Sequence, residues 1–455
     1  MITNFYGYLV WLTVSFNSRN APAGAVLLGV ILLLRYQQVH TMRRTIICYI
    51  GLVFFGFLGS PANAQYLTHD QVGAAAVFDM SAAYNKEVAD CGTPKRPSFL
   101  CSGVFLRGTV YSDAYRFWNY GPASVQATAF SWIRKDAKLR QLANDHRHGY
   151  IMRAMFDIPA DYLRLDVLCA FPLDAASAFR TDNGCGDSDK TVQIERSCQV
   201  ANITTAEAWL KDYLDNKKSY HRQCGFDVSP SVAAGAVAFM QFVNTHQLEE
   251  VRNQHFGTVG YSNNEVRIKS WPQSDGSRVP IWAIFWISQD PVTGAPSEAG
   301  KAEAQKDQMA LYEDSGHFRP IIRLTLPKTP ADDATFFYSP ADQAPLDKVM
   351  CRRFVDKARW VNRPDSDVKA NRWTLEITPT DCGRLSQANQ TDKFYAELVA
   401  NYSNDPQWIA ENKGGMRRQL VCVLTNYRTK DVYNLEPFRP DVSQEQAVAA
   451  GCNPF

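Results

Sequence analysis

Residues 104–115 read VFLRGTVYSDAY, and this stretch decides the fold that we expect for the chain. Its apolar run from 104 to 106, bounded by Gly103 and Gly108, predicts a short buried strand. Arg107 ends the run, and an unpaired guanidinium in such a strand would be costly. We therefore expect an anion beside Arg107, either a structural carboxylate or a bound ligand.

The rest of the chain repeats the strand pattern between helical stretches. Of its 455 residues, 45% are hydrophobic and 21% are charged, a composition typical of two or three folded domains. The clearest helical pattern begins at Ser229-Pro230 and runs to residue 243. Because helices and strands mix irregularly, we expect an α+β fold. The strand-like runs are 104–109, 150–157, 163–171, 264–271, 281–288 and 318–326.

The beginning of the chain differs from the rest. The first 64 residues contain no Asp or Glu. Within them, Met42-Arg43-Arg44 precedes an apolar core at 46–59, and small residues follow at Ala62 and Ala64. This pattern predicts a secretory signal peptide at 42–64, cleaved after Ala64, and hence an extracellular or periplasmic protein of a bacterium.

Because the signal begins at an internal methionine, we expect residues 1–41 to be an over-extended gene start. The rival interpretation is a membrane anchor at 24–34, which is short for a bilayer span. Loss of the leader removes four arginines and no acid, so 44 basic and 46 acidic residues remain. A nearly neutral protein has no electrostatic case for binding nucleic acid, and we expect no stable membrane association once the signal peptide is removed.

The cysteines also indicate export. Ten remain after the leader is removed, and an even number in an exported chain predicts disulfides. Metal binding is not expected, because the chain has no CxxC or HExxH motif and only the isolated HRH at 146–148. The cysteines are Cys91, Cys101, Cys169, Cys185, Cys198, Cys224, Cys351, Cys382, Cys422 and Cys452.

A stretch rich in Pro, Asp and Ala at 326–348 predicts a domain boundary. Six of the ten cysteines precede it and four follow it, so each part can close its own bridges. We therefore expect a main domain at 65–330, a linker at 331–350 and a small α+β or mainly β domain at 351–455.

Three segments of the main domain form an ordered set. VFLRGT carries Arg107 on a strand, QATAFSWIRKDAKL predicts a helix with Ser131 near its start, and GYSNNEVRIKSW places Glu265 at the start of a late strand. This order resembles the Arg-Ser-Glu class of mono-ADP-ribosyltransferases. The resemblance implies a mixed-strand domain with helices that consumes NAD.

A second resemblance covers about residues 90–330. The segments CSGVFLRGT, AFSWIRKDAK and LCAFPLD, with Tyr115, Trp118 and the Pro122-Ala-Ser-Val run, look like the secreted halovibrin family of NAD-consuming toxins or glycohydrolases. The sequence departs from the Arg-Ser-Glu pattern at two places. Ser131-Trp132-Ile133 replaces Ser-Thr-Ser, and Asn263 replaces the usual Gln or Glu, which weakens transfer to a protein more than it weakens hydrolysis.

The expected roles follow from the chemistry of NAD, the expected substrate; no permanently bound cofactor is expected. Arg107 would bind the pyrophosphate with its planar fork, and Glu265 would stabilise the oxocarbenium-like transition state. Ser131 would orient Glu265. The expected substrate-binding residues are Arg107, Gly108, Thr109, Tyr111, Trp118, Tyr261 and Asn263, of which the aromatic ones offer flat surfaces for nicotinamide or adenine.

Each of these residues also has a structural interpretation. Glu265 could be a surface strand residue paired with Arg267 or Lys269, Ser131 could cap a helix, and Trp118 could belong to the core. The alternative function is accordingly a secreted, non-catalytic binding protein that contacts a host. If the enzyme transfers ADP-ribose, a host protein is the expected acceptor.

The C-terminal domain has its own pattern. RWTLEITPT predicts a strand, MRRQLVCVL predicts another, and the chain then reads VYNLEPFRPDV and AAGCNPF. This ending resembles a module of unknown function found at the C-termini of secreted bacterial proteins. In it, Glu436 and Arg439 predict a structural ion pair in preference to a binding site.

Overall fold

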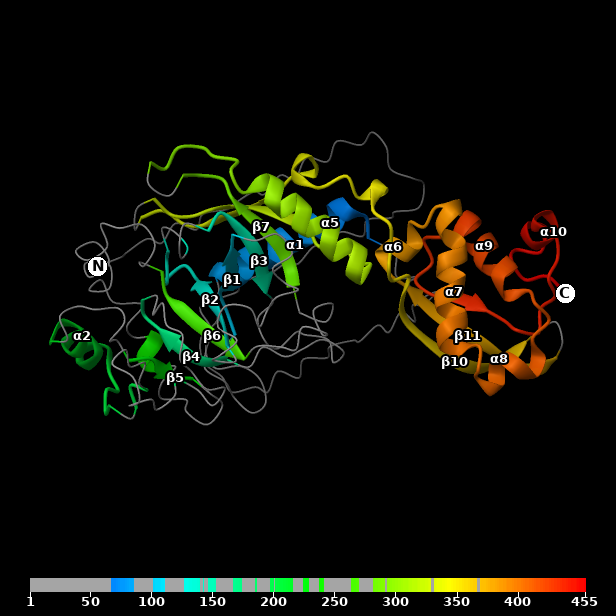
Figure 1. Ribbon diagram of the computed structural model, residues 1–455, viewed down its shortest axis with the longest axis horizontal. Helices are drawn as coiled ribbons and strands as arrows, with labels where there is room; N and C mark the ends of the chain where they lie inside the picture. Colours follow the sequence, from blue (N-terminus) through cyan, green and yellow to red (C-terminus); the bar gives the residue numbers. More distant parts are fainter. Residues whose placement is uncertain are drawn as a thin grey trace, which may run out of the picture. The chain divides into compact units, whose positions relative to one another are not determined.

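The protein is described here from a computed structural model, in which residues 63–455 form one unit (Figure 1). The structure describes 67–85, 101–110, 127–139, 142, 146–152, 167–173, 185, 197–199, 201–215, 224–228, 237–240, 263–269, 281–290, 293–328, 331–365 and 369–455. The predicted leader and the early start at 1–41 therefore lie outside the described residues.

The described residues form an α+β fold, as predicted. A nine-stranded mixed sheet has the order β5-β4-β6-β2-β1-β3-β7-β8-β9. Neighbouring strands are antiparallel except for β7 and β8, which are parallel and are joined through helix α5 (Lys301–Ser315). The strands are β1 Val104–Thr109, β2 Ala127–Ile133, β3 His148–Met152, β4 Val167–Phe171, β5 Phe226–Asp227, β6 Glu265–Lys269, β7 Ile281–Ile287, β8 Ile321–Thr325 and β9 Thr335–Tyr338.

Two helices cover opposite faces of this sheet (Figure 1). Helix α1 (His69–Asn85) buries Ala76, Met80 and Tyr84 in a cluster with Leu106 of β1. Helix α5 buries apolar residues in a second cluster that contains Phe105 of β1. Successive residues of a strand point to opposite faces, so the apolar run that opens the sequence analysis is buried on both sides.

All six predicted strand runs contain a strand, but β2 corrects one prediction. We expected a helix with Ser131 near its start, and residues 127–133 instead form a strand between β1 and β6. The reason is tertiary: Phe130 and Trp132 alternate with Ser131 and Ile133, so each set can be buried on its own face of a central strand. The Arg-Lys-Asp segment that suggested a helix comes after the strand.

The predicted linker at 331–350 is also corrected. Its residues include β9, which pairs with β8, and Asp342, which is fully buried. Asp342 forms two ion pairs: its Oδ1 lies 3.0 Å from Lys301 Nζ, and its Oδ2 lies 2.9 Å from Arg323 NH2. Pro and Asp are typical of surface connections, but here one Asp is the shared anion of two cations, so this stretch belongs to the folded body.

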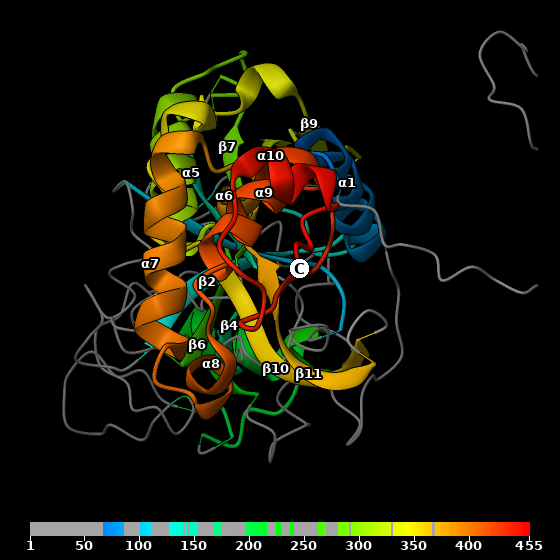
Figure 2. The same cartoon turned by 90° about the vertical axis from the view of Figure 1, so that its right-hand side faces the viewer.

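Residues after 350 form a three-stranded antiparallel sheet with helices (Figure 2). Strand β11 confirms the prediction for RWTLEITPT, whereas MRRQLVCVL is a helix and not a strand. Its buried residues Met416, Leu420 and Val423 recur at helical spacing, which the short apolar run concealed. The elements are β10 Val355–Asp365, β11 Ala370–Pro379, α6 Asp381–Arg384, α7 Thr391–Tyr402, α8 Pro406–Glu411, α9 Met416–Asn426, β12 Tyr433–Leu435 and α10 Gln444–Ala449.

The core of this C-terminal part includes residues from before the predicted boundary. Tyr312, on the last turn of α5, and Phe318 pack in the same apolar cluster as Phe354, Leu375 and Phe394. Backbone bonds follow the same path, because Cys382 N donates to Gly316 O at 2.8 Å. One helix, α5, therefore contributes side chains to the cores of both sheets.

Four disulfides are present among the described residues, and Cys101 is also disulfide-bonded. Each of the four joins cysteines from the same side of the predicted boundary, and Cys91 lies outside the described residues. Such bridges are typical of proteins that fold in an oxidising compartment, as an extracellular protein does. None of the helices within the described ranges is both long and apolar enough to cross a bilayer. The four bridges are Cys169–Cys185, Cys198–Cys224, Cys351–Cys382 and Cys422–Cys452.

Candidate functional site

The candidate site lies where β2 changes its partner. The ladder between β1 and β2 ends at the pair Leu106 and Ser131, and the ladder between β2 and β6 begins at Phe130 and Val266. Arg107 comes just after Leu106, the last β1 residue of the first ladder, and Glu265 comes just before Val266, the first β6 residue of the second ladder. The three predicted catalytic residues, from segments far apart in the sequence, therefore have neighbouring backbone positions at one branch of the sheet.

Arg107 is partly buried and does have an anionic neighbour. Its NH1 donates a hydrogen bond of 2.8 Å to the carbonyl oxygen of Ala129. Burial lowers the pKa of Arg107, and the charge of Glu265 acts in the opposite direction. Tyr150, its partner on β3, is fully buried beside it. The guanidinium is thus held at the branch by a β2 carbonyl and lies within electrostatic range of a carboxylate of β6.

Glu265 is 4% exposed, and its carboxylate already has a cationic partner. Its Oε1 accepts a hydrogen bond of 2.6 Å from Nε of Arg267, which is 3% exposed. The guanidinium of Arg267 lies 5.7 Å from the ring centre of Phe171. This is the pairing that the structural interpretation named, except that the pair is buried and not on the surface.

Ser131 and its neighbour Trp132 are held by two asparagines that come just before β6. Its Oγ accepts a hydrogen bond of 3.4 Å from Nδ2 of Asn263, which is 2% exposed. Asn264 Oδ1 accepts a bond of 2.8 Å from Trp132 N, and its Nδ2 donates a bond of 2.8 Å to Trp132 O. The Asn264 side chain thus replaces a strand residue at the branch. Sequence reasoning missed it, although the Asn-Asn pair before a strand was visible.

His146 is a second residue that sequence reasoning left aside. Burial, followed by the charges of Arg107 and His148, lowers the pKa of His146 to about 4, against a backbone hydrogen bond with Gly108. His146 is therefore a neutral imidazole beside the arginine at physiological pH. A Cβ atom on Gly108 would lie 2.8 Å from the Cβ of His146, so a glycine after Arg107 is what permits this approach.

The same close approach occurs on the next strand. A Cβ atom on Gly149 would lie 1.9 Å from the carbonyl oxygen of Arg107. Gly108 and Gly149 are direct partners in the ladder between β1 and β3, so two glycines face each other beside the arginine. The RG pair of the opening stretch thus has a packing reason that is independent of any ligand.

The remaining predicted residues divide into two groups. Thr109 is buried at the end of β1, and Gly108 and Asn263 lie at the branch as described above. Tyr111, Trp118 and Tyr261 lie outside the described residues. Within the described part of the chain, no group of three or more His, Cys, Asp or Glu side chains is arranged to hold a metal ion.

The predicted ion pair of the C-terminal pattern is present. Arg439 is 4% exposed, its Nε contacts Glu436, and its NH2 lies 3.2 Å from Oδ2 of Asp365. Its NH1 donates bonds of 3.2 and 3.3 Å to the carbonyl oxygens of Asn453 and Pro454. Arg439 thereby ties the end of the chain to Asp365, the last residue of β10, which is a structural role.

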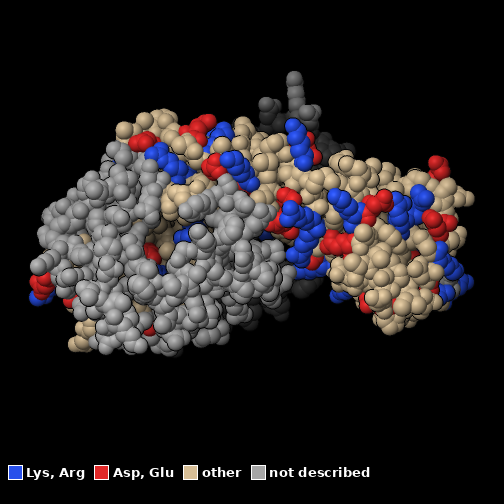
Figure 3. Space-filling model, in the orientation of Figure 1, with Lys and Arg blue, Asp and Glu red and all other residues tan. Residues whose placement is uncertain are grey.

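Charged side chains are interspersed on the face shown in Figure 3, where Lys and Arg alternate with Asp and Glu over the described C-terminal residues. Comparison with known proteins gives limited information on function. No curated protein and no solved structure matches the chain. Residues 355–455, the sheet and helices that Arg439 ties together, match a family described as a protein of unknown function, DUF2599.

Proposed function

We propose that the main domain is a secreted NAD-consuming enzyme that breaks the bond between nicotinamide and ribose. The observation that carries the proposal is the convergence of Arg107, Ser131 and Glu265 at the branch where β2 passes from β1 to β6. The resemblance of the same three segments to the Arg-Ser-Glu class and to the halovibrin family gives the convergence its chemical interpretation. A toxin or effector role would follow from secretion of such an activity.

The proposed chemistry requires an anion-binding group and a carboxylate on either side of one substrate. Arg107 would hold the pyrophosphate of NAD. As the bond to nicotinamide breaks, its electron pair leaves with neutral nicotinamide, and positive charge develops at the ribose C1 and ring oxygen. Glu265 would stabilise that charge more in the transition state than in the ground state. Water then adds to C1 and releases a proton.

Two neighbours would prepare Glu265 for this role. The hydrogen bond from Arg267 at 2.6 Å fixes the orientation of the carboxylate. Asn263, bonded to Ser131 Oγ, stands where the transferases carry Gln or Glu. The shorter asparagine side chain is engaged with Ser131 and with the carbonyl oxygen of Asn264, which favours water as the acceptor over a protein.

A second candidate function rests on the same ion pair. Because Glu265 already has Arg267 as a partner and is buried, the carboxylate could serve only to hold β6 in place. The protein would then be a secreted binding protein without catalytic activity. The two functions differ in one measurable property, the release of nicotinamide.

The test uses the mature chain from Gln65 with its disulfides formed. The protein is incubated with NAD and no added acceptor, and nicotinamide and ADP-ribose are separated and quantified by chromatography. The enzyme should release both in equal amounts. A Glu265→Gln preparation made in parallel controls for contaminating activity. If the parent and this variant release nicotinamide at the same rate, or neither does, the binding-protein function replaces the enzyme.

A further inference from the structure

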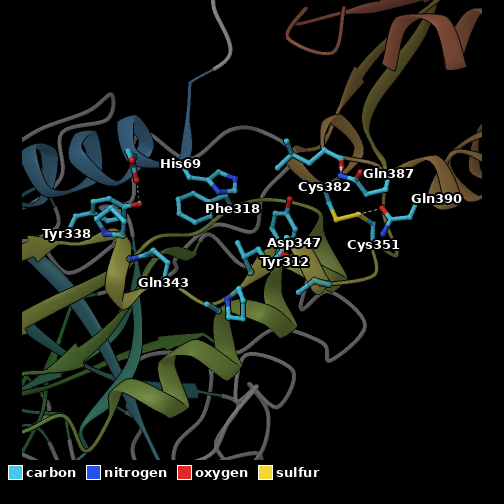
Figure 4. A pocket seen from close by; sticks show the side chains of 17 residues that line it. His69, Tyr312, Phe318, Tyr338, Gln343, Asp347, Cys351, Cys382, Gln387 and Gln390 are labelled. Atoms are coloured by element: carbon cyan, nitrogen blue, oxygen red, sulfur yellow. Dashed lines mark hydrogen bonds between the residues drawn. A yellow bond between two sulfur atoms is a disulfide. The ribbon is translucent and has the colours of Figure 1, made fainter. Parts of the chain in front are cut away.

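A second cavity lies away from the branch of the large sheet. It has a volume of about 460 Å³ and is bounded by the start of α1, the end of α5, the segment from 338 to 349 and the Cys351–Cys382 disulfide (Figure 4). A volume of this size is within the range of small-molecule sites. None of the residues at the β1, β2 and β6 branch lines it, so it is independent of the proposed NAD site.

One wall of this cavity is aromatic. The rings of His69 and Phe318 are stacked, with centres 3.9 Å apart and planes 8° apart, and Tyr312 meets His69 edge-on at 6.3 Å. Tyr338 completes the wall and lies against α1 at Gly73, where a Cβ atom would come within 2.3 Å of its ring. Figure 4 shows His69 and Phe318 side by side at the cavity.

The charged groups of the cavity are all acidic. Asp70 and Asp347 line it, and among its lining residues, all of them described, there is no Lys or Arg. His69 does not offset these acids, because burial lowers its pKa and leaves the imidazole neutral at pH 7. Asp381 and Asp70 both act on His69 through their negative charge. The cavity therefore disfavours phosphates, NAD and other anions.

One polar atom in the cavity wall is still available. Nε2 of His69 is buried and makes no hydrogen bond with the described residues. Two other polar groups of the lining are already engaged: Tyr338 donates its hydroxyl to Asp70 at 2.9 Å, and Gln343 bonds to the backbone of Ile321 and Ser339. A ligand with a hydrogen-bonding group would satisfy the imidazole nitrogen.

We propose that this cavity binds a small organic cation, a molecule with an alkylated ammonium group and one polar substituent. Aromatic faces attract such a cation through their π electrons, and acids at the rim add charge attraction. The polar substituent would pair with Nε2 of His69. This ligand class uses the aromatic wall, the acidic rim and the open nitrogen together, whereas an anion would be repelled and a hydrocarbon would leave the nitrogen unsatisfied.

Choline and its neutral isostere 3,3-dimethyl-1-butanol provide the decisive pair of probes. They have the same shape and hydroxyl group and differ in the charge. Calorimetric titration of the mature, oxidised protein should show choline binding, with affinity for the isostere lower by about tenfold, as expected for a cation bound by aromatic and acidic groups. Equal affinities, or no choline binding, would overturn the proposal.

Two acids of α1 make a matched pair of variants. Asp70 lines the cavity, whereas Asp79 lies on the same helix, is exposed and is not part of the lining. Asp70→Asn should weaken choline binding about threefold to tenfold, and Asp79→Asn should leave it unchanged. Asp347→Asn, at an exposed position, repeats the test if the first variant alters the fold. Equal losses in the variants of Asp70 and Asp79 would show that only the overall charge matters, contrary to the proposal.

Discussion

His317 forms an ion pair with Asp356 across the junction between α5 and the C-terminal sheet, with Nε2 3.3 Å from Oδ1. Its Nδ1 lies 3.7 Å from Oδ2 of Asp381, which also accepts a bond of 2.7 Å from Phe318 N. Burial alone would lower the pKa of His317, but the bonds to the two carboxylates raise it above the ordinary 6.5. The same contacts hold the pKa values of Asp356 and Asp381 below the ordinary 3.8 despite burial.

Stability should therefore depend on pH in a defined window. A raised histidine pKa contributes stability that is complete below about pH 6.5 and is lost as the pH rises through the folded-state pKa of His317. The lowered pKa values of Asp356 and Asp381 contribute stability above about pH 3.8 that is lost as the pH falls. The melting temperature of the parent protein should therefore decrease as the pH is raised from 6 to 8.

His317→Gln supplies the control for this pH dependence. Glutamine keeps a hydrogen-bond donor at the position but does not titrate, so the variant should be less stable than the parent at pH 6 and should lose less stability from pH 6 to 8. Arg319 and His69 also lie near this cluster and keep their own charges in both proteins. An unchanged slope in the variant would assign the titration to another group.

Glu265→Gln should lower NAD turnover by on the order of a hundredfold with little change in NAD binding, because the missing charge matters only as the bond breaks. Glutamine retains an oxygen for the bond from Arg267, so the fold should persist. Glu376→Gln, another glutamate paired with arginine but on β11, is the matched control and should keep full turnover. Nicotinamide release and NAD titration measure the two quantities, and equal turnover in the two variants would refute the catalytic role.

Arg107→Lys should instead weaken NAD binding, because a point charge replaces a bidentate fork. Ser131→Ala should change NAD binding less than Arg107→Lys and turnover less than Glu265→Gln, since its hydroxyl only positions other groups. Titration calorimetry with NAD compares the affinities of the three variants. The order would be wrong if Arg107→Lys bound NAD like the parent while Ser131→Ala did not.

Gly108→Ala should be destabilised by about 1–3 kcal/mol, because its Cβ would overlap His146 at the densely packed strand pair. His146→Gly in the same chain, which removes the Cβ atom that the new methyl group would meet at 2.8 Å, should recover part of that loss, which an independent effect of the alanine on the strand would not allow. Denaturant unfolding of both single variants and of the double variant measures this coupling.

Peptide mapping of the oxidised protein should find five bridges, the four observed here and one between Cys101 and Cys91, which is the remaining cysteine of the predicted mature chain. The mature N-terminus should be Gln65 if the leader is cleaved where the sequence predicts. A bridge from the first six cysteines to the last four would contradict the structure, and a product that retained residues 1–41 would refute the predicted start.

The sequence was most informative where a pattern is local. Short apolar runs rich in Val, Ile and Phe predicted β1, β7 and β8, because burial on both faces leaves that signature. It was misleading where a neighbour decides the structure. Ser131 precedes a run of charges typical of a helix, but β1 and β6 on either side keep it in a strand. The buried turn of α9 was too short a run to distinguish a helix from a strand.

The candidate site shows the same limit. Arg107, Ser131 and Glu265 could be named from their order, but their meeting point depends on where one ladder ends and the next begins. The roles of His146 and Asn264 depend on contacts with residues 38 and 132 positions away, Gly108 and Trp132. No local pattern contains that information. The partner of Glu265, by contrast, is two residues along the same strand and was foreseeable.

The placement of Tyr312 and Phe318 in the core of the C-terminal sheet has a consequence for recombination. A segment that begins at residue 355, where the family match begins, would contain the apolar surface on which these two rings pack, but not the rings themselves. Grafted onto another protein, residues 355–455 would expose an apolar surface that needs two other aromatic side chains to cover it. Chains that share this module should therefore carry, just upstream of it, a helix end with aromatic residues. A recombination that transfers the module with its core intact would need its boundary within or before that helix.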